Sequence, residues 1–458
     1  PSIFSHMARA RSETMNRKQR DRLKQQAPIS LEITGLSHDG RGIGHHDGKI
    51  VFVSGALTGE TVEAKVTLVR SKYDEADTVA VLKASPIRVT PPCQHFGVCG
   101  GCSLQHIDPN AQILLKQQVL MDQFKHFGHL EPEEWLPPLA FGQGGYRRKA
   151  RLGVRFVIKK DSLLVGFREK GSNFLAELDR CEVMDQRIGE SILSLRALIN
   201  GLNAKDHIPQ IEVAAGDDSV ALIFRHMEAL IDSDVQALID FCQQRDWQCY
   251  LQPKGYDTVH RVYPEQGTDR LRYALPDFNL TMQFHPLDFT QVNADINRKM
   301  LTLALDLLDP QPHERVLDLF CGLGNFTLPL ATRAASVIGV EGSEAMVERG
   351  YENARHNNIT NVDFYAQDLT ADFSQQEWAK QGFDALLIDP PRSGALEVVQ
   401  YLPKFGAKRI VYVSCNPATL ARDAGELAKA GYKLIKAGVM DMFTHTAHVE
   451  SIALFVKE

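Results

Sequence analysis

The chain has 458 residues, and its 51 Lys and Arg against 57 Asp and Glu give a formal net charge of −6 at pH 7. This charge excludes a uniformly basic nucleic-acid binder but leaves room for a locally basic surface. The sequence has no apolar run long enough to cross a membrane and no secretory hydrophobic segment near its start. We therefore expect a cytoplasmic protein that has no membrane partner.

Residues 1–25 form a basic segment with few apolar side chains. Residues 1–7 resemble a cloning remnant and predict nothing about the fold. The charged positions of the segment are Arg9, Arg11, Arg17, Lys18, Arg20, Arg22 and Lys24 against Glu13 and Asp21. This composition predicts a tail that is disordered until it meets a partner, and the alternative is a tail that is merely solvated.

Residues 26–85 have the pattern of a small β-barrel. Alternating and β-branched residues predict strands at 29–36, 49–53, 61–69 and 77–83, and glycines punctuate this region. Several short strands within about 60 residues predict an OB-like barrel, a fold that often binds single-stranded nucleic acid. The alternative is a barrel that only spaces its neighbours.

A cysteine cluster opens the central segment, 86–289. Its spacing is Cys93-x5-Cys99-x2-Cys102, with Cys181 as a distant fourth thiol. Four thiolates suit either a 4Fe-4S cluster or structural zinc, although zinc sites prefer two C-x2-C pairs. A radical S-adenosylmethionine enzyme is a rival interpretation, but it would use three cysteines spaced x3 and x2 and leave one iron open. The x5 spacing and the fourth cysteine indicate a closed, structural site.

The rest of the central segment mixes helices and strands, as an α+β domain does. Apolar spacing predicts a helix at 108–127, with Asp108 as N-cap and Pro109 at its first position. Two further helices are predicted at 190–202 and 232–245. A strand predicted at 146–158 belongs to the basic stretch Tyr146–Lys160, which has no acid and contains Phe156. Cations interleaved with aromatic rings suit single-stranded RNA, and a solvated strand face is the alternative.

From about residue 290 to the end, apolar strands alternate with helices. The expected strands are 315–319, 336–341, 362–366, 385–389 and 409–414, and the helices are 293–308, 326–334 and 343–357. This order predicts a Rossmann-like α/β domain with a parallel, doubly wound sheet. Ligands of such sheets bind at the carboxyl ends of the strands.

Side chains at those ends predict a site for a methyl donor. Gly322 and Gly324 allow a tight turn after the first strand, where Phe320 and Asn325 would line a pocket. Three carboxylates lie at the ends of other strands. Glu341 suits ribose hydroxyls, Asp368 suits an adenine amine, and Asp389 suits a polar contact with the substrate. The acidic and apolar neighbours of the glycine turn favour a sulfonium nucleoside over a dinucleotide.

Cys415, in Val413–Pro417, has the context of a nucleophile. A thiolate that adds to C6 of a pyrimidine turns C5 into a nucleophile toward a methyl group, and a base must then remove the C5 proton. Glu450, in His448–Ser451, fits that base, and Asp389, in Asp389–Arg392, fits a group that holds the uracil edge. The alternative for a cysteine is a buried structural thiol, which suits Cys242, Cys249 and Cys321 better.

These motifs, together with Leu317–Asn325, resemble the uracil-5 RNA methyltransferases that use S-adenosylmethionine, and residues 26–85 resemble the TRAM domain. The resemblance implies that Cys415 is the nucleophile and Glu450 the proton-abstracting base. It implies a 4Fe-4S cluster on the four cysteines, and it implies that residues 104–143 pack with the domain at 290–458. The implied cofactor contacts are Gln291, Phe320, Asn325, Glu341 and Asp389, with Asp368 retained where close relatives often carry Asn.

Barrel, cysteine cluster and catalytic segment together resemble the family members that act on bacterial 23S rRNA. The tRNA members resemble only the catalytic part, which argues against a tRNA substrate. Another rRNA uridine or a tRNA is the alternative within the class. A non-catalytic RNA-binding factor is the alternative outside it, although Cys415 and Glu450 are both present. The sequence indicates no obligate protein partner.

Overall fold

The computed structural model describes residues 15–140 and 144–458, so the proposed cloning remnant at 1–7 lies outside the described residues. The chain divides into two compact units. The first contains the N-terminal part through Gly97 together with Cys102–Ala111 and His445–Ala447, and the second contains Val98–Gly101, Gln112–Thr444 and His448–Glu458. The chain therefore passes between the units several times.

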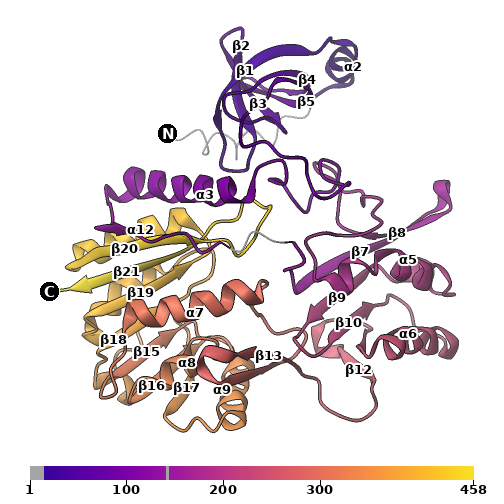
Figure 1. Cartoon of the computed structure of the whole chain (residues 1–458). Coiled ribbons are helices and arrows are strands. Elements are labelled where there is room, and N and C mark those ends of the chain that lie inside the picture. Colours follow the sequence, from indigo (N-terminus) through magenta and orange to yellow (C-terminus); the bar gives the residue numbers. More distant parts are fainter. Residues whose placement is uncertain (1–14, 141–143) are drawn as a thin grey trace. The chain divides into compact units, whose positions relative to one another are not determined.

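The first unit holds a closed five-stranded barrel with the order β1-β2-β3-β5-β4, as the sequence predicted (Figure 1). Its strands are β1 (Ile29–Leu36), β2 (Gly42–His46), β3 (Lys49–Ser54), β4 (Thr61–Val69) and β5 (Tyr73–Lys83). β2 was not predicted, because its glycines look like turn residues. Gly44 is needed there for close approach, since a Cβ would lie 2.6 Å from Leu31 Cδ1 and 2.8 Å from the carbonyl oxygen of Glu32.

The basic segment is helical over α2 (Arg17–Gln25), so the prediction of a disordered tail is wrong for these residues. Asn16 and Gln19 form a capping box: the Asn16 side chain accepts from Gln19 N at 2.8 Å, and the Gln19 side chain accepts from Asn16 N at 3.0 Å. Leu23 packs into the barrel core. The cap and this one apolar contact stabilise a helix that composition alone would not predict.

The second unit contains an eight-stranded sheet with the order β17-β16-β15-β18-β19-β21-β20-β6. The strands are β15 (Arg315–Leu319), β16 (Ser336–Glu341), β17 (Val362–Ala366), β18 (Ala385–Ile388), β19 (Arg409–Ser414), β20 (Tyr432–Met440), β21 (Glu450–Lys457) and β6 (Glu134–Trp135). The five strands from β15 to β19 are parallel, as predicted. The sequence did not predict the antiparallel part of the sheet, in which β21 runs antiparallel to both β19 and β20.

Helices cover both faces of this sheet (Figure 1). One face packs against α7 (Ala294–Leu308), α8 (Thr327–Ala331) and α9 (Glu344–His356), and the other packs against α3 (Pro109–Gln123), α11 (Leu396–Tyr401) and α12 (Pro417–Lys429). Strand alternation explains the division: Val316 faces the first set and Leu317 the second. A short helix, α10 (Glu377–Lys380), precedes β18.

Helix α3 begins as the sequence predicted. Asp108 Oδ1 accepts a hydrogen bond of 2.9 Å from Asn110 N, which confirms Asp108 as the N-cap. The helix is α-helical to Gln123 and continues as a π-helical turn over Phe124–Gly128. Beyond it, β6 pairs in parallel with β20, so this part of the central segment joins the eight-stranded sheet.

The remaining central residues form a six-stranded sheet with the order β12-β11-β10-β9-β7-β8 and a hairpin. The sheet contains β7 (Lys149–Val157), β8 (Ser162–Gly166), β9 (Gln210–Ala215), β10 (Val220–Arg225), β11 (Gln248–Gln252) and β12 (His260–Tyr263). The hairpin is β13 (Leu271–Leu275) and β14 (Leu280–Phe284), and the helices are α4 (Gln186–Gly189), α5 (Ile192–Asn200) and α6 (Asp232–Arg245). Within the described ranges, no helix combines the length and apolarity that a membrane span needs.

Candidate active site

Cys415 and Glu450 come together through the antiparallel pairing of β19 and β21. Ser414, the last residue of β19, pairs with Ser451. Cys415 follows Ser414 and Glu450 precedes Ser451, so this last pair of the ladder brings the two residues together, and the charge of Glu450 acts on the Cys415 thiol. Glu450 is buried and Cys415 is half-buried. The antiparallel strand that the sequence did not predict is therefore what brings the two predicted catalytic groups together.

The turn that carries Cys415 is held on both sides. Ser414 Oγ accepts from Asn416 N at 3.0 Å and donates to the carbonyl oxygen of Asn416 at 2.9 Å. Asn416 caps α12 by accepting from Ala418 N at 3.1 Å, and its Nδ2 donates to the carbonyl oxygen of Arg392 at 3.0 Å. Cys415 thus lies at the N-terminus of a 13-residue helix, a position that favours a thiolate.

The electrostatics of the site favour neutral groups. Burial, with smaller effects from Glu450 and Asp389, raises the pKa of the Cys415 thiol to about 11, while Arg392 opposes this shift. Burial and the nearby Asp389 raise the pKa of Glu450 well above its usual range, and Lys116 opposes that shift. Burial also raises the pKa of Asp389 to about 7. Ionisation of Glu450 as a base and of Cys415 as a thiolate at neutral pH therefore depends on nearby positive charge.

Lys116 is a buried residue that the sequence interpretation missed. Its side chain is 3% exposed, and its Nζ donates to the carbonyl oxygen of Phe443 at 3.0 Å and lies 3.4 Å from Asp441 Oδ1. A signal for it was available, because a lysine three residues after Ile113 and four before Leu120 lies on the apolar face of α3.

The loop after β15 has the conformation expected of a close-approach turn. Phe320, Gly322 and Gly324 have φ values of 58°, 54° and 103°, all in the left-handed region. Glycine suits this region, whereas Phe320 is strained there. Asp389 N donates to the carbonyl oxygen of Leu319 at 3.3 Å, which joins this loop to the one after β18.

Asn325, at the end of the loop, is fixed by side chains from outside the motif. Its Oδ1 accepts from the Tyr273 hydroxyl at 2.9 Å and from Asn297 Nδ2 at 3.1 Å, and its Nδ2 donates to Asn297 Oδ1 at 2.8 Å. Neither partner was predicted. Asn297 had a signal, since it lies on the apolar face of α7 with Met300 and Leu301, whereas Tyr273 had none.

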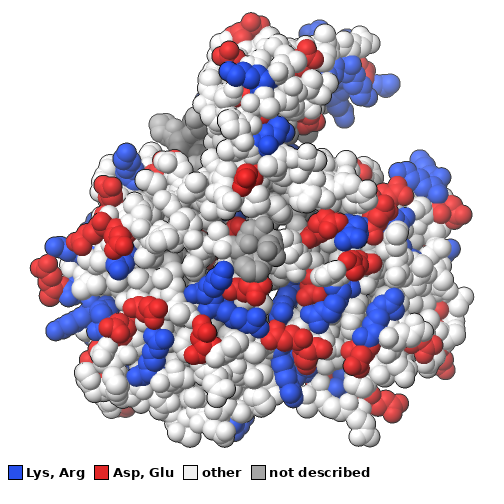
Figure 2. Space-filling model, viewed as in Figure 1, with Lys and Arg blue, Asp and Glu red and all other residues white. Residues whose placement is uncertain are grey.

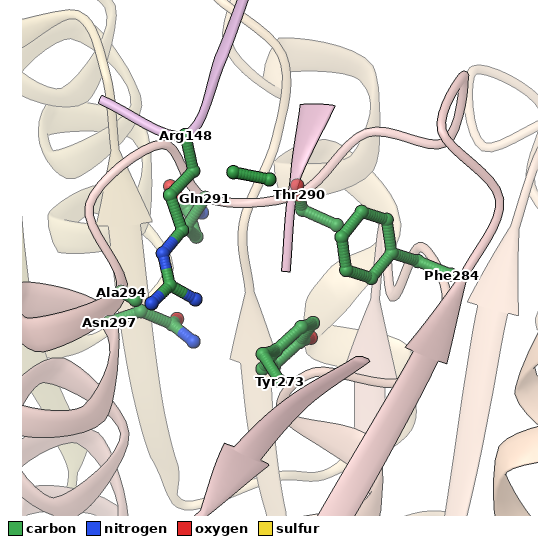
Figure 3. A pocket seen from close by; sticks show the side chains of 8 residues that line it. Arg148, Tyr273, Phe284, Thr290, Gln291, Ala294 and Asn297 are labelled. Carbon is green, nitrogen blue, oxygen red and sulfur yellow. The ribbon is translucent and has the colours of Figure 1, made fainter. Parts of the chain in front are cut away.

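A small pocket lies beside this amide network, and Gln291 faces it (Figure 3). The structure thus brings Gln291 close to the two residues that fix Asn325, as expected if Gln291 and Asn325 contact the same ligand. The pocket is lined by Arg148, Ala215, Tyr273, Phe284, Thr290, Gln291, Ala294 and Asn297.

The carboxylates at the ends of β16 and β17 have local hydrogen bonds. Glu341 Oε2 accepts from Ser343 N at 2.6 Å. Asp368 is exposed, and its Oδ1 accepts from Thr370 N at 3.0 Å and from Thr370 Oγ1 at 2.6 Å, which lowers the pKa of Asp368. Both residues therefore stabilise turns, whatever they contact besides.

The four clustered cysteines are divided between the units. Cys93 and Cys102 belong to the first unit, Cys99 and Cys181 to the second, and all four are half-buried. Backbone N–H groups of His95 and Gly101 donate to Cys93 Sγ and Cys99 Sγ, each at 3.4 Å. Among residues 15–140 and 144–458, no three or more His, Cys, Asp and Glu side chains form a group that could hold a metal ion. The metal site stays a prediction. The other expected structural thiols, Cys242, Cys249 and Cys321, are buried.

The basic stretch Tyr146–Lys160 is less available to a partner than its composition suggested. Arg148 forms an ion pair with Asp217, and Lys149 Nζ donates to the carbonyl oxygen of Asp288. The cations that remain exposed are Arg151, Arg155, Lys159 and Lys160. β7 alternates between exposed and buried positions, so only part of the stretch faces solvent.

The fold and motifs place the chain in a known class. Residues 109–458 match the family model described as tRNA (Uracil-5-)-methyltransferase, and residues 29–79 match the TRAM domain model. The chain therefore belongs to the uracil-5 methyltransferase family, and its N-terminal barrel is a TRAM domain. This confirms the class of enzyme that the motifs predicted.

Individual relatives are more specific. The chain is 59% identical over 432 residues to a protein of Alcanivorax borkumensis named 23S rRNA (uracil(1939)-C(5))-methyltransferase RlmD, covering 94% of this chain and 97% of that protein. It is 56% identical to the protein of the same name from Hahella chejuensis, covering 96% and 99%. The Pyrococcus abyssi tRNA (uracil-54, C5)-methyltransferase in complex with S-adenosyl-L-homocysteine aligns with a TM-score of 0.72 at 24% identity, covering 93% of this chain and 99% of that one. That last similarity shows the fold alone.

Proposed function

We propose that this enzyme transfers a methyl group from S-adenosylmethionine to C5 of a uridine in 23S rRNA, the uridine that corresponds to position 1939 in the names of its relatives. The observation that carries the proposal is the pairing of β19 with β21, which brings Cys415 and Glu450 together near Asp389. The names of relatives that match nearly the whole chain support the substrate. An enzyme that modifies bacterial rRNA would meet its substrate in the cytoplasm.

The chemistry assigns one step to each group. The Sγ of the Cys415 thiolate forms a bond to C6 of the uracil, and the ring electrons pass through C5 to the O4 carbonyl as an enolate. The methyl donor, when bound, would supply an electrophilic methyl group, which C5 takes as the sulfur–methyl bond breaks and S-adenosylhomocysteine is left. Glu450 then removes the C5 proton, the C5–C6 double bond forms again, and the Cys415 thiolate leaves. Asp389 holds the uracil edge, and its raised pKa lets it donate a hydrogen bond when protonated.

We assign the methyl donor to Gln291, Phe320, Asn325, Glu341 and Asp389, with Asp368 as a weaker contributor because it is exposed. The fixed amide of Asn325, the position of Gln291 in the adjacent pocket and the left-handed loop support this assignment. The positive sulfonium of the donor would also favour ionised carboxylates in a site where burial disfavours them.

We propose that Cys93, Cys99, Cys102 and Cys181 bind a 4Fe-4S cluster. Four half-buried cysteines, with backbone N–H groups directed at the sulfurs of Cys93 and Cys99, fit thiolate ligands, since hydrogen bonds to sulfur are common around such clusters. Protein purified without oxygen should contain about four irons and four labile sulfides per chain. Replacing Cys181 with Ala should lower both, and Cys415→Ala should lower neither. Stoichiometric zinc would contradict the assignment.

Two exposed basic surfaces support binding of RNA. Helix α2 carries Arg17, Lys18, Arg20, Arg22 and Lys24. Blue side chains gather in Figure 2 where Figure 1 labels this helix. The second surface is the exposed part of Tyr146–Lys160. The uridine must leave any base stack to reach a half-buried Cys415, so we expect it in a loop or extruded from a helix.

A covalent adduct tests the proposal. A 5-fluorouridine in the RNA cannot lose its C5 substituent as a proton, so the methylated ring stays bound to the thiol. Denaturing mass spectrometry should detect a protein–RNA adduct for the wild type with 23S rRNA fragments and S-adenosylmethionine, and none for Cys415→Ala. Adducts with tRNA alone would favour the alternative substrate. Absence of any adduct despite bound donor would favour a non-catalytic RNA-binding factor.

A further inference from the structure

Lys116 places an ammonium group inside the second unit, at the strand connection that leads to the proposed base. The side chain is 3% exposed and that of Asp441 is fully buried, with Nζ and Oδ1 3.4 Å apart. A second bond runs from Nζ to the carbonyl oxygen of Phe443 at 3.0 Å. Asp441 is itself held, because its Oδ2 accepts from Thr444 Oγ1 at 2.9 Å. The ammonium therefore has a fixed position.

This position is next to Glu450. Met440, the last residue of β20, pairs with Glu450, the first residue of β21, and Asp441 follows Met440 directly. Asp389 after β18, Cys415 after β19 and Lys116 on α3 interact electrostatically with Glu450, Asp441 pairs with Lys116, and His448, two residues before Glu450 in the chain, is also affected by Lys116. Asp389 opposes ionisation of Glu450, and Lys116 favours it.

Burying a charged lysine at this position is unfavourable in free energy. A contribution to folding stability therefore does not explain why a lysine is present. Taking an ion pair out of water is unfavourable for each ion, and an apolar pair of similar volume is often as stable. A group that must be an anion in order to work gives a reason to keep the cation. Glu450 is buried near another carboxylate, and it can accept a proton only while it is ionised.

We propose that Lys116 is a positioning residue for proton abstraction: its ammonium group, anchored by Asp441 and the Phe443 carbonyl, keeps Glu450 in the ionised form that accepts the C5 proton. The inference rests on the proposed function, because it deepens the role of the same base. Lys116 does not contact the uracil in this scheme and forms no bond during the reaction.

The test is single-turnover methylation by Lys116→Gln, measured as a function of pH. A neutral amide can still donate to the Phe443 carbonyl and to Asp441, so the fold should survive. At pH values below the pKa of Glu450, each unit by which that pKa rises lowers the methylation rate about tenfold. We expect at least this loss at neutral pH, an acid limb moved to higher pH, and a covalent adduct that persists on ordinary RNA. Lys116→Arg, which keeps the charge, should retain the wild-type acid limb.

Two controls distinguish the effect of losing the Lys116 charge from a general impairment of the enzyme. Lys125→Met removes an exposed lysine from the π-helical turn that continues α3, and it should leave the pH profile unchanged. RNA that contains 5-fluorouridine needs no proton abstraction to form its methylated adduct, so Lys116→Gln and wild type should form it at equal rates. The expected result is thus a defect that appears with uridine and disappears with 5-fluorouridine.

Several outcomes would overturn the inference. If Lys116→Gln methylates ordinary RNA with the wild-type acid limb, or slows uridine and 5-fluorouridine RNA equally, Lys116 has only a structural role. If Lys116→Arg shows the same shift as Lys116→Gln, charge is not the cause. If the wild type itself forms no adduct with 5-fluorouridine RNA, the proposed function fails first, so the two failures are distinguishable.

Discussion

Asn297 and Asn325 exchange two hydrogen bonds, of 2.8 and 3.1 Å, between helix α7 and the loop after β15. The pair fixes which way the amide of Asn325 points, because Tyr273 also donates to its Oδ1. Helix α7 therefore orients the loop after β15. The proposed donor site depends on Asn297, which belongs to none of the sequence motifs.

Asn297→Ala should weaken binding of S-adenosylmethionine. The substitution removes two of the three hydrogen bonds that fix the amide of Asn325 and leaves its Nδ2 without the Asn297 acceptor, which costs about 1–3 kcal/mol, or roughly fivefold to 150-fold in Kd. Isothermal titration calorimetry with S-adenosylhomocysteine measures the effect. Asn203→Ala, at an exposed position, is the matched control. Equal affinity in both variants would mean that Asn325 does not contact the donor.

Glu450→Gln should separate bond formation from proton removal. A neutral amide of the same shape cannot act as a base, and losing a general base typically slows a reaction by about 10²–10⁴-fold. Because Cys415 remains, the methylated adduct should accumulate on ordinary uridine RNA, where the wild type releases product. Denaturing gel electrophoresis with labelled RNA would show it. Release of methylated RNA at the wild-type rate would rule out Glu450 as the base.

The parts of the fold that the sequence predicted are those with a local signal. The apolar runs of β15 and β16 match their predicted positions, and α7 begins within one residue of its predicted start, since strand burial and helix amphipathicity act over a few residues. Helix α2 was mispredicted as disorder, because its stability comes from one buried contact, Leu23, and a capping box. Composition records neither.

The candidate site shows the same limit. Cys415 and Glu450 were predicted from their motifs, but the reason that they meet is the antiparallel register of β21, which no motif encodes. Lys116 was missed because it lies more than 300 positions from Glu450 in the chain, and the expected packing of residues 104–143 with the domain at 290–458 does not tell which side chain comes near Glu450. Contacts between distant segments depend on topology, and a single sequence predicts topology poorly.

Asp318→Asn should flatten the dependence of stability on pH. Burial raises the pKa of Asp318 to about 8, with a smaller effect from Asp389, while its hydrogen bond from Thr327 Oγ1 opposes the shift. The folded state thus holds a proton that the unfolded state releases near its usual pKa of 3.8. The resulting stability is fully present below that value, and it is lost as pH rises toward 8.

Chemical denaturation at a series of pH values from 5 to 8 measures this effect. The wild type should lose stability across that window, and Asp318→Asn should lose less, because the amide has no proton to release. Asp389, with a pKa of about 7, leaves a residual slope in the variant. Identical slopes in the two proteins would show that Asp318 is ionised in the folded state.

Replacing Arg20 and Lys24 of α2 with Gln should weaken RNA binding and reduce its dependence on salt. Both side chains are exposed, and the helix carries one acid, Asp21. Each lost phosphate contact lowers the slope of log K against log salt by roughly 0.7 on single-stranded RNA, so the double variant should lose about 1.4. Fluorescence anisotropy at several salt concentrations measures the slope. Lys380→Gln, which removes an exposed lysine of α10, should change neither affinity nor slope. If the double variant also keeps the wild-type slope, α2 is a solvated helix, and the phosphate contacts lie on the barrel or on the exposed part of Tyr146–Lys160.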